Sequence, residues 1–234
     1  TVPKIIQHLI QAQYKKPILC ASKGLAHIDH TSYLFHELPG LKSLNQPLGY
    51  LSGPTFAHEL TRGILTGAVV TGSHYSEWHS LLHRKHFHIY SCDDAVGVAL
   101  CSLYKNIAAM LAGCCQPPLL GENSRALLLS KTIAALTQTI QACSGDPKTA
   151  WGPAGLGDII LSGTSMASRN YQFGYNLAQN IQHPSITTES LANLTSLHLY
   201  LQKHNHNCDF VNLAHQIITT PSMCKEYIQT WLTH

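Results

Sequence analysis

The sequence predicts an α/β segment over residues 1–93, followed by an all-α helical segment over residues 94–234. Two patterns support this prediction. Short apolar runs that end in Gly or Ser alternate with helical spacing up to about residue 92, and no strand pattern follows Asp93. The composition is that of a folded chain, because 44% of the 234 residues are hydrophobic and only 12% are charged.

The first segment contains both helical and strand-like pieces. Apolar residues that recur every three to four positions predict a helix, and short apolar runs bounded by Gly, Pro or Ser predict a strand. Because helices separate the strands, we expect a parallel sheet. In chain order the pieces are "KIIQHLIQAQ" (helix, 4–13), "PILCAS" (strand, 17–22), "GYLSG" (strand, 49–53), "GAVVTG" (strand, 67–72), "EWHSLLHRK" (helix, 77–85) and "FHIYSC" (strand, 87–92).

The second segment reads as a series of helices separated by Gly, Pro and Asn. Its first helix contains the apolar window 95–113, which has the length of a membrane span. Lys105 stands at the centre of that window and would cost about 2.5–3.5 kcal/mol in a bilayer, so we expect a buried helix and no integral membrane segment. The predicted helices cover about 94–113, 122–143, 170–180, 188–203, 208–218 and 222–232.

Charge and cysteine usage exclude several classes of protein. The net charge is +3 and no block of Lys or Arg occurs, so we expect no nucleic-acid partner. Eight cysteines are scattered without C-x-x-C pairs, which predicts reduced thiols and a cytoplasmic location. The chain begins at Thr1 without signal-peptide features, and we interpret it as starting within a longer gene product.

Histidines cluster in "HRKHFH" (83–88) and "HNHN" (204–207), a pattern that invites a zinc interpretation. Neither cluster has a Cys or carboxylate at ligand spacing, so we expect no metal site.

Two lysines are candidates for chemistry. Lys105 is the only charged side chain between Asp94 and Glu122. If it is buried, its pKa should tend downward, as a general acid or base requires; the alternative is a lysine that snorkels to the helix edge. Lys23 follows a predicted strand, where α/β sheets bind ligands, and is equally compatible with an ordinary loop lysine.

The stretch "LSGPTFA" (51–57) follows another predicted strand. Gly53 allows close approach of the backbone to a ligand, and Thr55 can cap the next helix. A purely structural turn explains both residues equally well.

The glycine-rich run "WGPAGLGDIILSGTSMASRN" (151–170) is neither a dinucleotide fingerprint nor a P-loop. Its glycines have the spacing G-x-x-G-x-G, no Lys-Ser or Lys-Thr follows them, and no G-x-G-x-x-G occurs elsewhere. Asp158 is predicted near the start of a short helix, and Ser168 as the cap of the next helix. Arg169 at that second helix start favours a phosphate site, although a plain cap is the commoner explanation.

Taken in order, these segments resemble the bacterial NAD(P)-dependent glycerol-3-phosphate dehydrogenases. The resemblance spans roughly residues 3–215. It implies a partial Rossmann segment followed by a helical domain like the C-terminal domain of 6-phosphogluconate dehydrogenase. The matching motifs are "SKGL" (22–25), "LSGPTFA" (51–57), "GVALCSLYKN" (97–106), "GEN" (121–123), "GPAGLGDIILSGTS" (152–165) and "SRN" (168–170).

The resemblance also implies a reaction and a set of site residues. Such enzymes interconvert dihydroxyacetone phosphate and sn-glycerol 3-phosphate with NADH or NADPH, for glycerophospholipid synthesis, and a homodimer is expected. Lys105 corresponds to the proton donor and acceptor at the C2 oxygen. The other substrate contacts implied are Lys23, Gly53, Thr55, Asp158, Ser168, Arg169 and Asn170, and the cofactor contacts implied are Lys23, Ala57, Arg169 and Glu189.

The chain departs from the family pattern in three places. The strands that carry the glycine fingerprint are absent, so we expect weak substrate binding and little cofactor binding by these 234 residues. Cys101 and Ser102 replace a glycine pair, where they crowd the cofactor or tighten helix packing, and "QPPLLG" (116–121) replaces a glycine-rich loop. These departures motivate an alternative, a non-catalytic helical module that binds a small phosphate ester or a partner protein.

Overall fold

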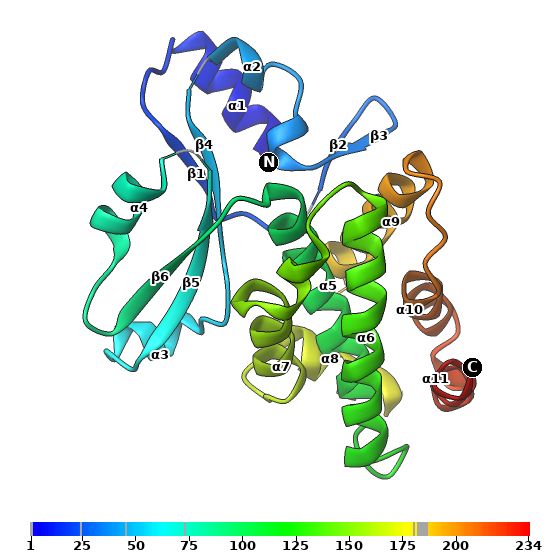
Figure 1. Cartoon of the computed structure of the whole chain (residues 1–234). Coiled ribbons are helices and arrows are strands. Elements are labelled where there is room, and N and C mark those ends of the chain that lie inside the picture. The colour runs from blue at the N-terminus through cyan, green and yellow to red at the C-terminus, as the bar shows by residue number, and fades with distance from the viewer. Residues whose placement is uncertain (1, 24, 45, 73, 180, 182–186) are drawn as a thin grey trace.

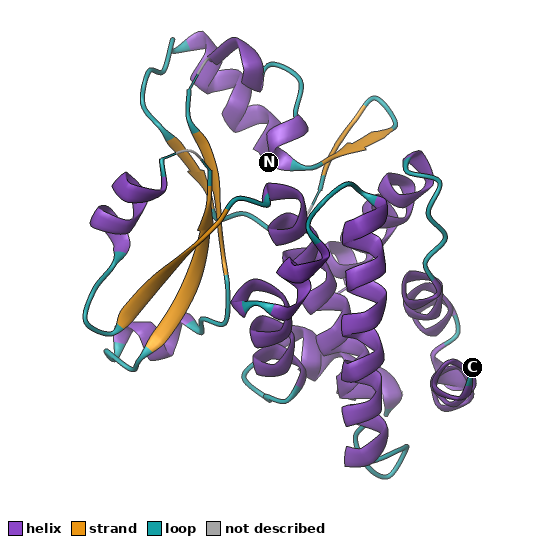
Figure 2. Cartoon of the chain, in the orientation of Figure 1, coloured by secondary structure: helices purple, strands orange, loops and turns teal. Residues whose placement is uncertain are grey.

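A computed structural model describes residues 2–23, 25–44, 46–72, 74–179, 181 and 187–234. It has a sheet-containing half and a helical half, packed side by side (Figure 1, Figure 2). The first half contains α1 (Val2–Gln11), β1 (Ile18–Cys20), β2 (Ala26–Ile28), β3 (Thr31–Tyr33), the 3-10 helix η1 (Phe35–Glu37), α2 (Leu41–Leu44), β4 (Leu48–Ser52), α3 (Ala57–Thr61), β5 (Thr66–Thr71), α4 (Tyr75–Leu82) and β6 (Phe87–Cys92). The predicted pieces occur in the predicted order, but the β2–β3 hairpin, η1 and α2 were not among them.

The main sheet has the strand order β1-β4-β5-β6. β1 and β4 are parallel, and so are β5 and β6, but β4 and β5 run antiparallel. The prediction of an all-parallel sheet was therefore wrong at this one junction. The reason is the connection: α3 has five residues, a rise of roughly 7–8 Å, whereas a strand of five or six residues runs about 17–20 Å. α3 alone is therefore too short to carry the chain back along the sheet. β5 begins beside the turn that follows β4, where the Thr66 hydroxyl donates to the carbonyl of Pro54, and runs back along β4.

The described residues of the second half form helices and their connections and contain no strand, and every helix predicted from the sequence is confirmed to within two residues. Short turns of helix that were not separately predicted connect α6 to α7 and α10 to α11. The elements are α5 (Ala95–Cys114), α6 (Glu122–Ala142), the 3-10 helix η2 (Pro147–Trp151), the π-helical turn η3 (Pro153–Gly157), α7 (Asp158–Gly163), α8 (Arg169–Ala178), α9 (Thr187–Lys203), α10 (Asp209–Thr219), the 3-10 helix η4 (Pro221–Met223) and α11 (Cys224–Thr233).

Helix α5 is the core of the molecule. Asp94 caps it by accepting a hydrogen bond of 2.8 Å from the backbone N–H of Gly97. By length and composition α5 is apolar enough to cross a membrane, and 83% of its most apolar window is buried inside the protein. A helix that is apolar on all sides is buried, as the sequence predicted.

One continuous hydrophobic core joins the two halves, running from Ile6 and Tyr50 through α5 to Ile228. A smaller cluster on the other face of the sheet packs under α4. Because the larger core crosses residue 93, the division into domains at 1–93 and 94–234 stays a prediction.

Close contact between α5 and α8 brings the two helices of the later site together. A Cβ atom on Gly174 would overlap the carbonyl oxygen of Met110, and one on Gly113 would overlap that of Tyr171. Glycine is therefore required at both positions for the helices to lie this close.

We expect Gly174→Ala to destabilise the protein by about 1–3 kcal/mol, because the added methyl group forces the two helix backbones apart. Urea unfolding followed by circular dichroism measures the loss. Gly121→Ala is the matched control, since no atom lies within 4 Å of the added Cβ there. Equal urea midpoints for Gly174→Ala and Gly121→Ala would contradict the close packing of α5 against α8.

Candidate functional site

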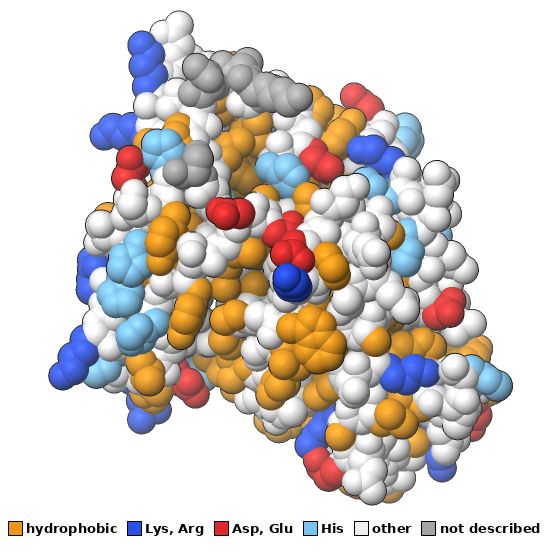
Figure 3. Space-filling model, viewed as in Figure 1, with side chains coloured by type: hydrophobic (Ala, Val, Ile, Leu, Met, Phe, Trp, Pro, Cys, Tyr) orange, Lys and Arg blue, Asp and Glu red, His pale blue; other side chains and the backbone are white. Residues whose placement is uncertain are grey.

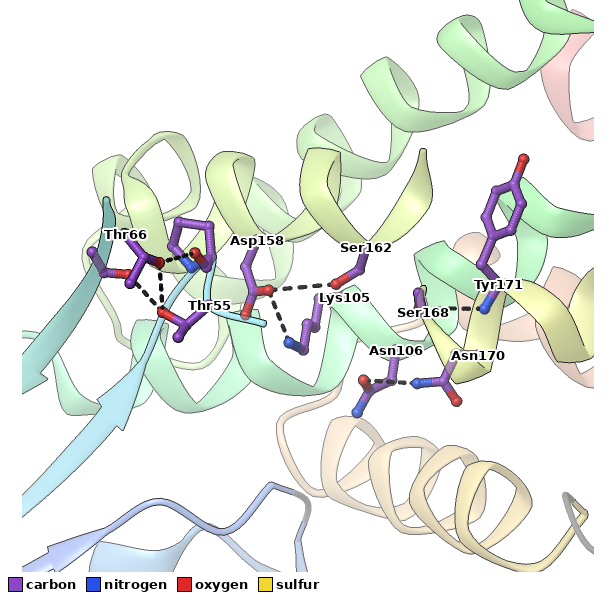
Figure 4. Close-up of polar contacts among 11 residues, drawn as sticks. Thr55, Thr66, Lys105, Asn106, Asp158, Ser162, Ser168, Asn170 and Tyr171 are labelled. Carbon is purple, nitrogen blue, oxygen red and sulfur yellow. Dashed lines mark hydrogen bonds and ion pairs between the residues drawn. The ribbon is translucent and has the colours of Figure 1, made fainter. Parts of the chain in front are cut away.

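The site is built around a buried ion pair between two helices. Lys105 lies in the middle of α5, and its Nζ atom donates to Oδ1 of Asp158 over 2.8 Å (Figure 4). Both residues are inside the protein, with 6% and 1% of their surfaces exposed. Lys105 is thus buried and paired, and does not snorkel to a helix edge.

The glycine-rich turn places Asp158 at the first position of α7, as predicted. A Cβ on Gly155 would overlap the backbone of Ala150, so only glycine permits this tight entry. A Cβ on Gly157 would lie 3.4 Å from Cγ of Pro54. The turn after β4 and the start of α7 are therefore neighbours.

The carboxylate of Asp158 has one oxygen in use and one without a partner. Oδ1 accepts from Lys105 and, over 3.4 Å, from the hydroxyl of Ser162. Oδ2 is buried with no hydrogen-bond partner in the described protein. Burial raises the pKa of Asp158, and the nearby ammonium of Lys105 partly offsets that rise. A buried oxygen without a partner indicates a place for a ligand hydroxyl group.

Lys23 brings a second ammonium to this pair from the loop between β1 and β2. Its side chain is exposed, and its pKa is lowered to about 8. The largest cause is partial removal of the ammonium from water, followed by repulsion from Lys105. Arg169 lowers the pKa further, and Asp158 partly offsets both effects. Lys105 and Lys23 thus act on the Asp158 carboxylate, and Arg169 acts on Lys23, so positive charge exceeds negative charge here and suits an anionic ligand.

The start of α8 completes the described site. The Ser168 hydroxyl accepts from the backbone N–H of Tyr171 over 3.4 Å, which confirms the predicted helix cap. Asn170 Nδ2 donates to Oδ1 of Asn106 over 3.0 Å, and Asn106 follows Lys105 on α5 (Figure 4). Arg169 is exposed at the first position of the helix.

Two polar residues that the structure places here, Asn106 and Ser162, are not among the site residues predicted from the sequence. Signals for both were available. Asn106 is adjacent to Lys105, and Ser162 stands four residues after Asp158, one helical turn away on the same face.

The turn after β4 is held by its own hydrogen bonds. Gly53 has φ of 142°, and a Cβ there would lie 2.9 Å from the Cα atom of Ala68. The Thr55 hydroxyl donates to the carbonyl of Gly67 over 2.9 Å, and the Thr66 hydroxyl donates to the carbonyl of Pro54 over 2.9 Å. These contacts account for Gly53 and Thr55 structurally, and their substrate contacts stay a prediction. Ala57, the predicted cofactor contact, begins α3.

The two residues that replace a glycine pair are absorbed into the packing of α5. The Cys101 side chain is fully buried, with Sγ 3.8 Å from the carbonyl oxygen of Thr149. The Ser102 hydroxyl donates to the carbonyl of Ala99 over 2.7 Å. These contacts belong to the packing of α5 and of its own backbone, and crowding of the cofactor stays a prediction.

Glu189, a predicted cofactor contact, belongs to α9. Its side chain lies outside the described part of the chain, so its cofactor contact stays a prediction.

Histidines gather over the outer side of the sheet near α4 and β6 (Figure 3). There the rings of His79 and His83 stack at 4.4 Å, and no three metal-binding side chains among the described residues are arranged to hold an ion.

Comparison with known proteins agrees with this architecture. The family model for the N-terminus of NAD-dependent glycerol-3-phosphate dehydrogenase matches residues 1–78, and the model for its C-terminus matches residues 94–229. A glycerol-3-phosphate dehydrogenase (NAD(P)+) of Coxiella burnetii is 30% identical over 213 residues, which are 87% of this chain and 63% of that protein. The chain thus spans somewhat less than two thirds of the length of this relative.

Solved structures of glycerol-3-phosphate dehydrogenases also match this chain. The crystal structure of glycerol-3-phosphate dehydrogenase from Coxiella burnetii has a TM-score of 0.86 at 28% identity, over 100% of this chain and 74% of that chain. The structure of the Dunaliella salina protein matches with a TM-score of 0.83 at 19% identity, over 97% of this chain and 43% of that one, and shows the fold alone.

A Rossmann-like half joined to a helical half defines the structural class, which is the fold of the nicotinamide-dependent dehydrogenases that this chain matches. Within that class, the chain belongs to the NAD-dependent glycerol-3-phosphate dehydrogenase family.

Proposed function

We propose that this protein interconverts dihydroxyacetone phosphate and sn-glycerol 3-phosphate with NADH or NADPH. The observation that carries the proposal is the Lys105–Asp158 ion pair with Lys23 beside it and Arg169 close enough to act on Lys23. A phosphate ester satisfies this excess of positive charge, and a hydroxyl group beside the phosphate satisfies the unpartnered oxygen of Asp158.

In this proposal Lys105 is the acid and base at the C2 oxygen. Reduction of a ketone builds negative charge on that oxygen, and an ammonium group directed at it stabilises the charge and then supplies the proton. Asp158 holds the Lys105 ammonium in position through the 2.8 Å ion pair. In the reverse direction the neutral amine takes the proton from the hydroxyl group.

The phosphate is bound away from the reacting carbon in this proposal. Arg169 offers a planar guanidinium at the first turn of α8, where backbone N–H groups carry partial positive charge. Lys23 adds a second cation from the opposite half of the molecule. Holding the phosphate at this end fixes the orientation of the carbonyl group toward Lys105.

We infer that NAD or NADP is the cofactor, and two of the residues present, Lys23 and Arg169, fit an anionic group of it, although the glycine fingerprint that binds the pyrophosphate does not occur in this sequence. Lys23 and Arg169 are exposed cations that repel each other, so an anion between them relieves the repulsion. These two residues would hold the cofactor, with Ala57 and Glu189 as further contacts. When bound, the cofactor supplies the hydride. The side chains described above bind and orient the substrate and supply the proton to its C2 oxygen.

We infer a cytoplasmic location and a role in glycerophospholipid synthesis. All eight cysteines are free thiols, which suits a reducing compartment. A homodimer stays an expectation from the family resemblance. The alternative of a non-catalytic helical module is not favoured, because the site residues of both halves converge and the chain belongs to a dehydrogenase family.

Calorimetry with sn-glycerol 3-phosphate tests the proposal, with glycerol as the control that lacks the phosphate. We expect heat of binding with the phosphate ester and none with glycerol. Equal responses to both compounds would contradict a phosphate site. Oxidation of NADH or NADPH in the presence of dihydroxyacetone phosphate tests the reaction itself.

The affinity for sn-glycerol 3-phosphate should fall as the pH rises through about 8, because Lys23 loses its charge there. The second pKa of the phosphate is about 6, so the phosphate is already a dianion in this pH range, and the change in affinity comes from the protein. Calorimetry between about pH 7 and about pH 9.5 should show the dissociation constant rising several-fold, with an upper bound of about tenfold per pH unit. Lys23→Gln is the control and should bind weakly with little pH dependence over this range. An unchanged pH profile in that variant would exclude Lys23 as the titrating group.

A further inference from the structure

The loop that carries Lys23 is anchored at its two ends by different parts of the protein. It leaves the main sheet at Cys20, the end of β1, and enters the β2–β3 hairpin at Ala26. This hairpin forms a separate two-stranded sheet and does not pair with the main one. The position of Lys23 therefore depends on where the hairpin docks.

The hairpin docks on α9 in the helical half, as Figure 1 shows. The hydroxyl of Tyr200 donates to Oε1 of Glu37 over 3.1 Å, and Tyr200 is only 1% exposed. The ammonium of Lys203 lies 5.3 Å from the centre of the Tyr33 ring, within the range of a cation–π interaction. Both contacts join the segment after Lys23 to the last turns of α9.

Glu37 is fixed from its own side as well. Its Oε2 atom accepts the backbone N–H of Leu34 over 2.9 Å, which orients Oε1 toward Tyr200. Glu37 takes part in none of the ion pairs among the described residues. The side-chain donor to its carboxylate among these residues is the hydroxyl of Tyr200. Burial and the Glu37 carboxylate both raise the pKa of Tyr200, so this hydroxyl keeps its proton and remains a donor.

We propose that Tyr200 and Lys203 are positioning residues for Lys23: by docking η1 and the β2–β3 hairpin that precedes it on α9, they hold the Lys23 ammonium beside the Lys105–Asp158 pair. The proposal rests on the proposed function in treating Lys23 as a substrate contact. A loop released at one end samples many positions, and a displacement of about 1 Å is enough to disturb a catalytic arrangement.

The titration of Lys23 reports its position without any substrate. Partial burial, the largest cause, and repulsion from Lys105 and Arg169 together lower the pKa of Lys23 to about 8, and Asp158 opposes these effects. If the hairpin is released, the ammonium moves away from these groups, and its pKa should rise toward the ordinary value of 10.5. A role of Tyr200 in overall stability alone would not change this value in a protein that stays folded.

The experiment measures acetylation of Lys23 by acetic anhydride across pH, quantified by mass spectrometry, in the whole chain and in Tyr200→Phe and Lys203→Gln. We expect the pKa of Lys23 to rise by about one unit or more in Tyr200→Phe, by less in Lys203→Gln, and by most in the double variant. Tyr75→Phe is the matched control, because it removes a tyrosine hydroxyl that donates over 3.2 Å to the carbonyl of Ile89 on the far side of the sheet.

Far-UV circular dichroism establishes that each variant is folded. Should Tyr200→Phe fail to fold, Lys203→Gln and Tyr33→Leu test the same docking at more exposed positions. The proposal is overturned if the pKa of Lys23 stays at its wild-type value in every docking variant that folds. Binding of sn-glycerol 3-phosphate is measured separately, so failure of the proposed function leaves the titration result readable.

Discussion

Replacing Lys105 by methionine should lower the rate of dihydroxyacetone phosphate reduction by about 10²–10⁴-fold. Methionine has similar length but cannot supply a proton or stabilise charge on the C2 oxygen. The measurement is the initial rate of NADH or NADPH oxidation at saturating substrate. Lys148→Met is the control, because Lys148 is exposed on η2. Full activity in Lys105→Met would remove Lys105 from the chemistry.

Loss of turnover has to be separated from loss of folding, and the double variant Lys105→Met with Asp158→Asn does this. It removes the whole buried ion pair and leaves two neutral side chains of similar size. We expect this variant to be folded and inactive, which shows that the loss of turnover does not come from loss of folding.

The second large effect is on stability. Lys105→Met alone should lower the free energy of unfolding by about 3–5 kcal/mol at neutral pH, because it leaves the Asp158 carboxylate buried without its cation. Urea unfolding monitored by circular dichroism measures this loss. The double variant with Asp158→Asn should recover most of it, and Lys148→Met should behave like the wild type. A double variant no more stable than Lys105→Met would contradict the pairing.

The pH dependence of this loss has a defined sign. Burial already raises the pKa of Asp158 in the folded protein, and removing Lys105 takes away the largest influence that lowers it. An acid whose folded pKa is raised adds stability below its unfolded value, and loses that stability as the pH rises through the folded value. The Lys105→Met protein should therefore lose stability from about pH 4 toward neutral pH, and the double variant should not.

Capping residues and helix breakers made most of the helices predictable. Asp94 and Ser168 stand where α5 and α8 begin, and the glycines before Asp158 mark the entry to α7. The β2–β3 hairpin was missed because its short strands lack a clear alternation of apolar residues. Its turn is formed by Asp29 and His30, both with positive φ, where Asn-Gly is the usual signal.

The residues of the candidate site could be predicted from the sequence, but their arrangement in space could not. Lys105, Asp158 and Arg169 each follow a recognisable local pattern, and their motifs occur in the order of the family to which the chain belongs. No local pattern states that Lys105 pairs with Asp158 or that Asn106 receives a bond from Asn170, because each pair is joined only by the packing of α5 against other helices.

The sequence by itself determined the two-part architecture, the helix starts and the family, because periodicity, capping and motif order are local properties of the chain. Tertiary structure alone decided that β4 and β5 run antiparallel, that Lys105 is paired, and that Lys23 joins it from the other half. The physical reason is that these features depend on connection length, on burial and on contacts between segments far apart in the chain. Such contacts form only when α5 is enclosed by its neighbours.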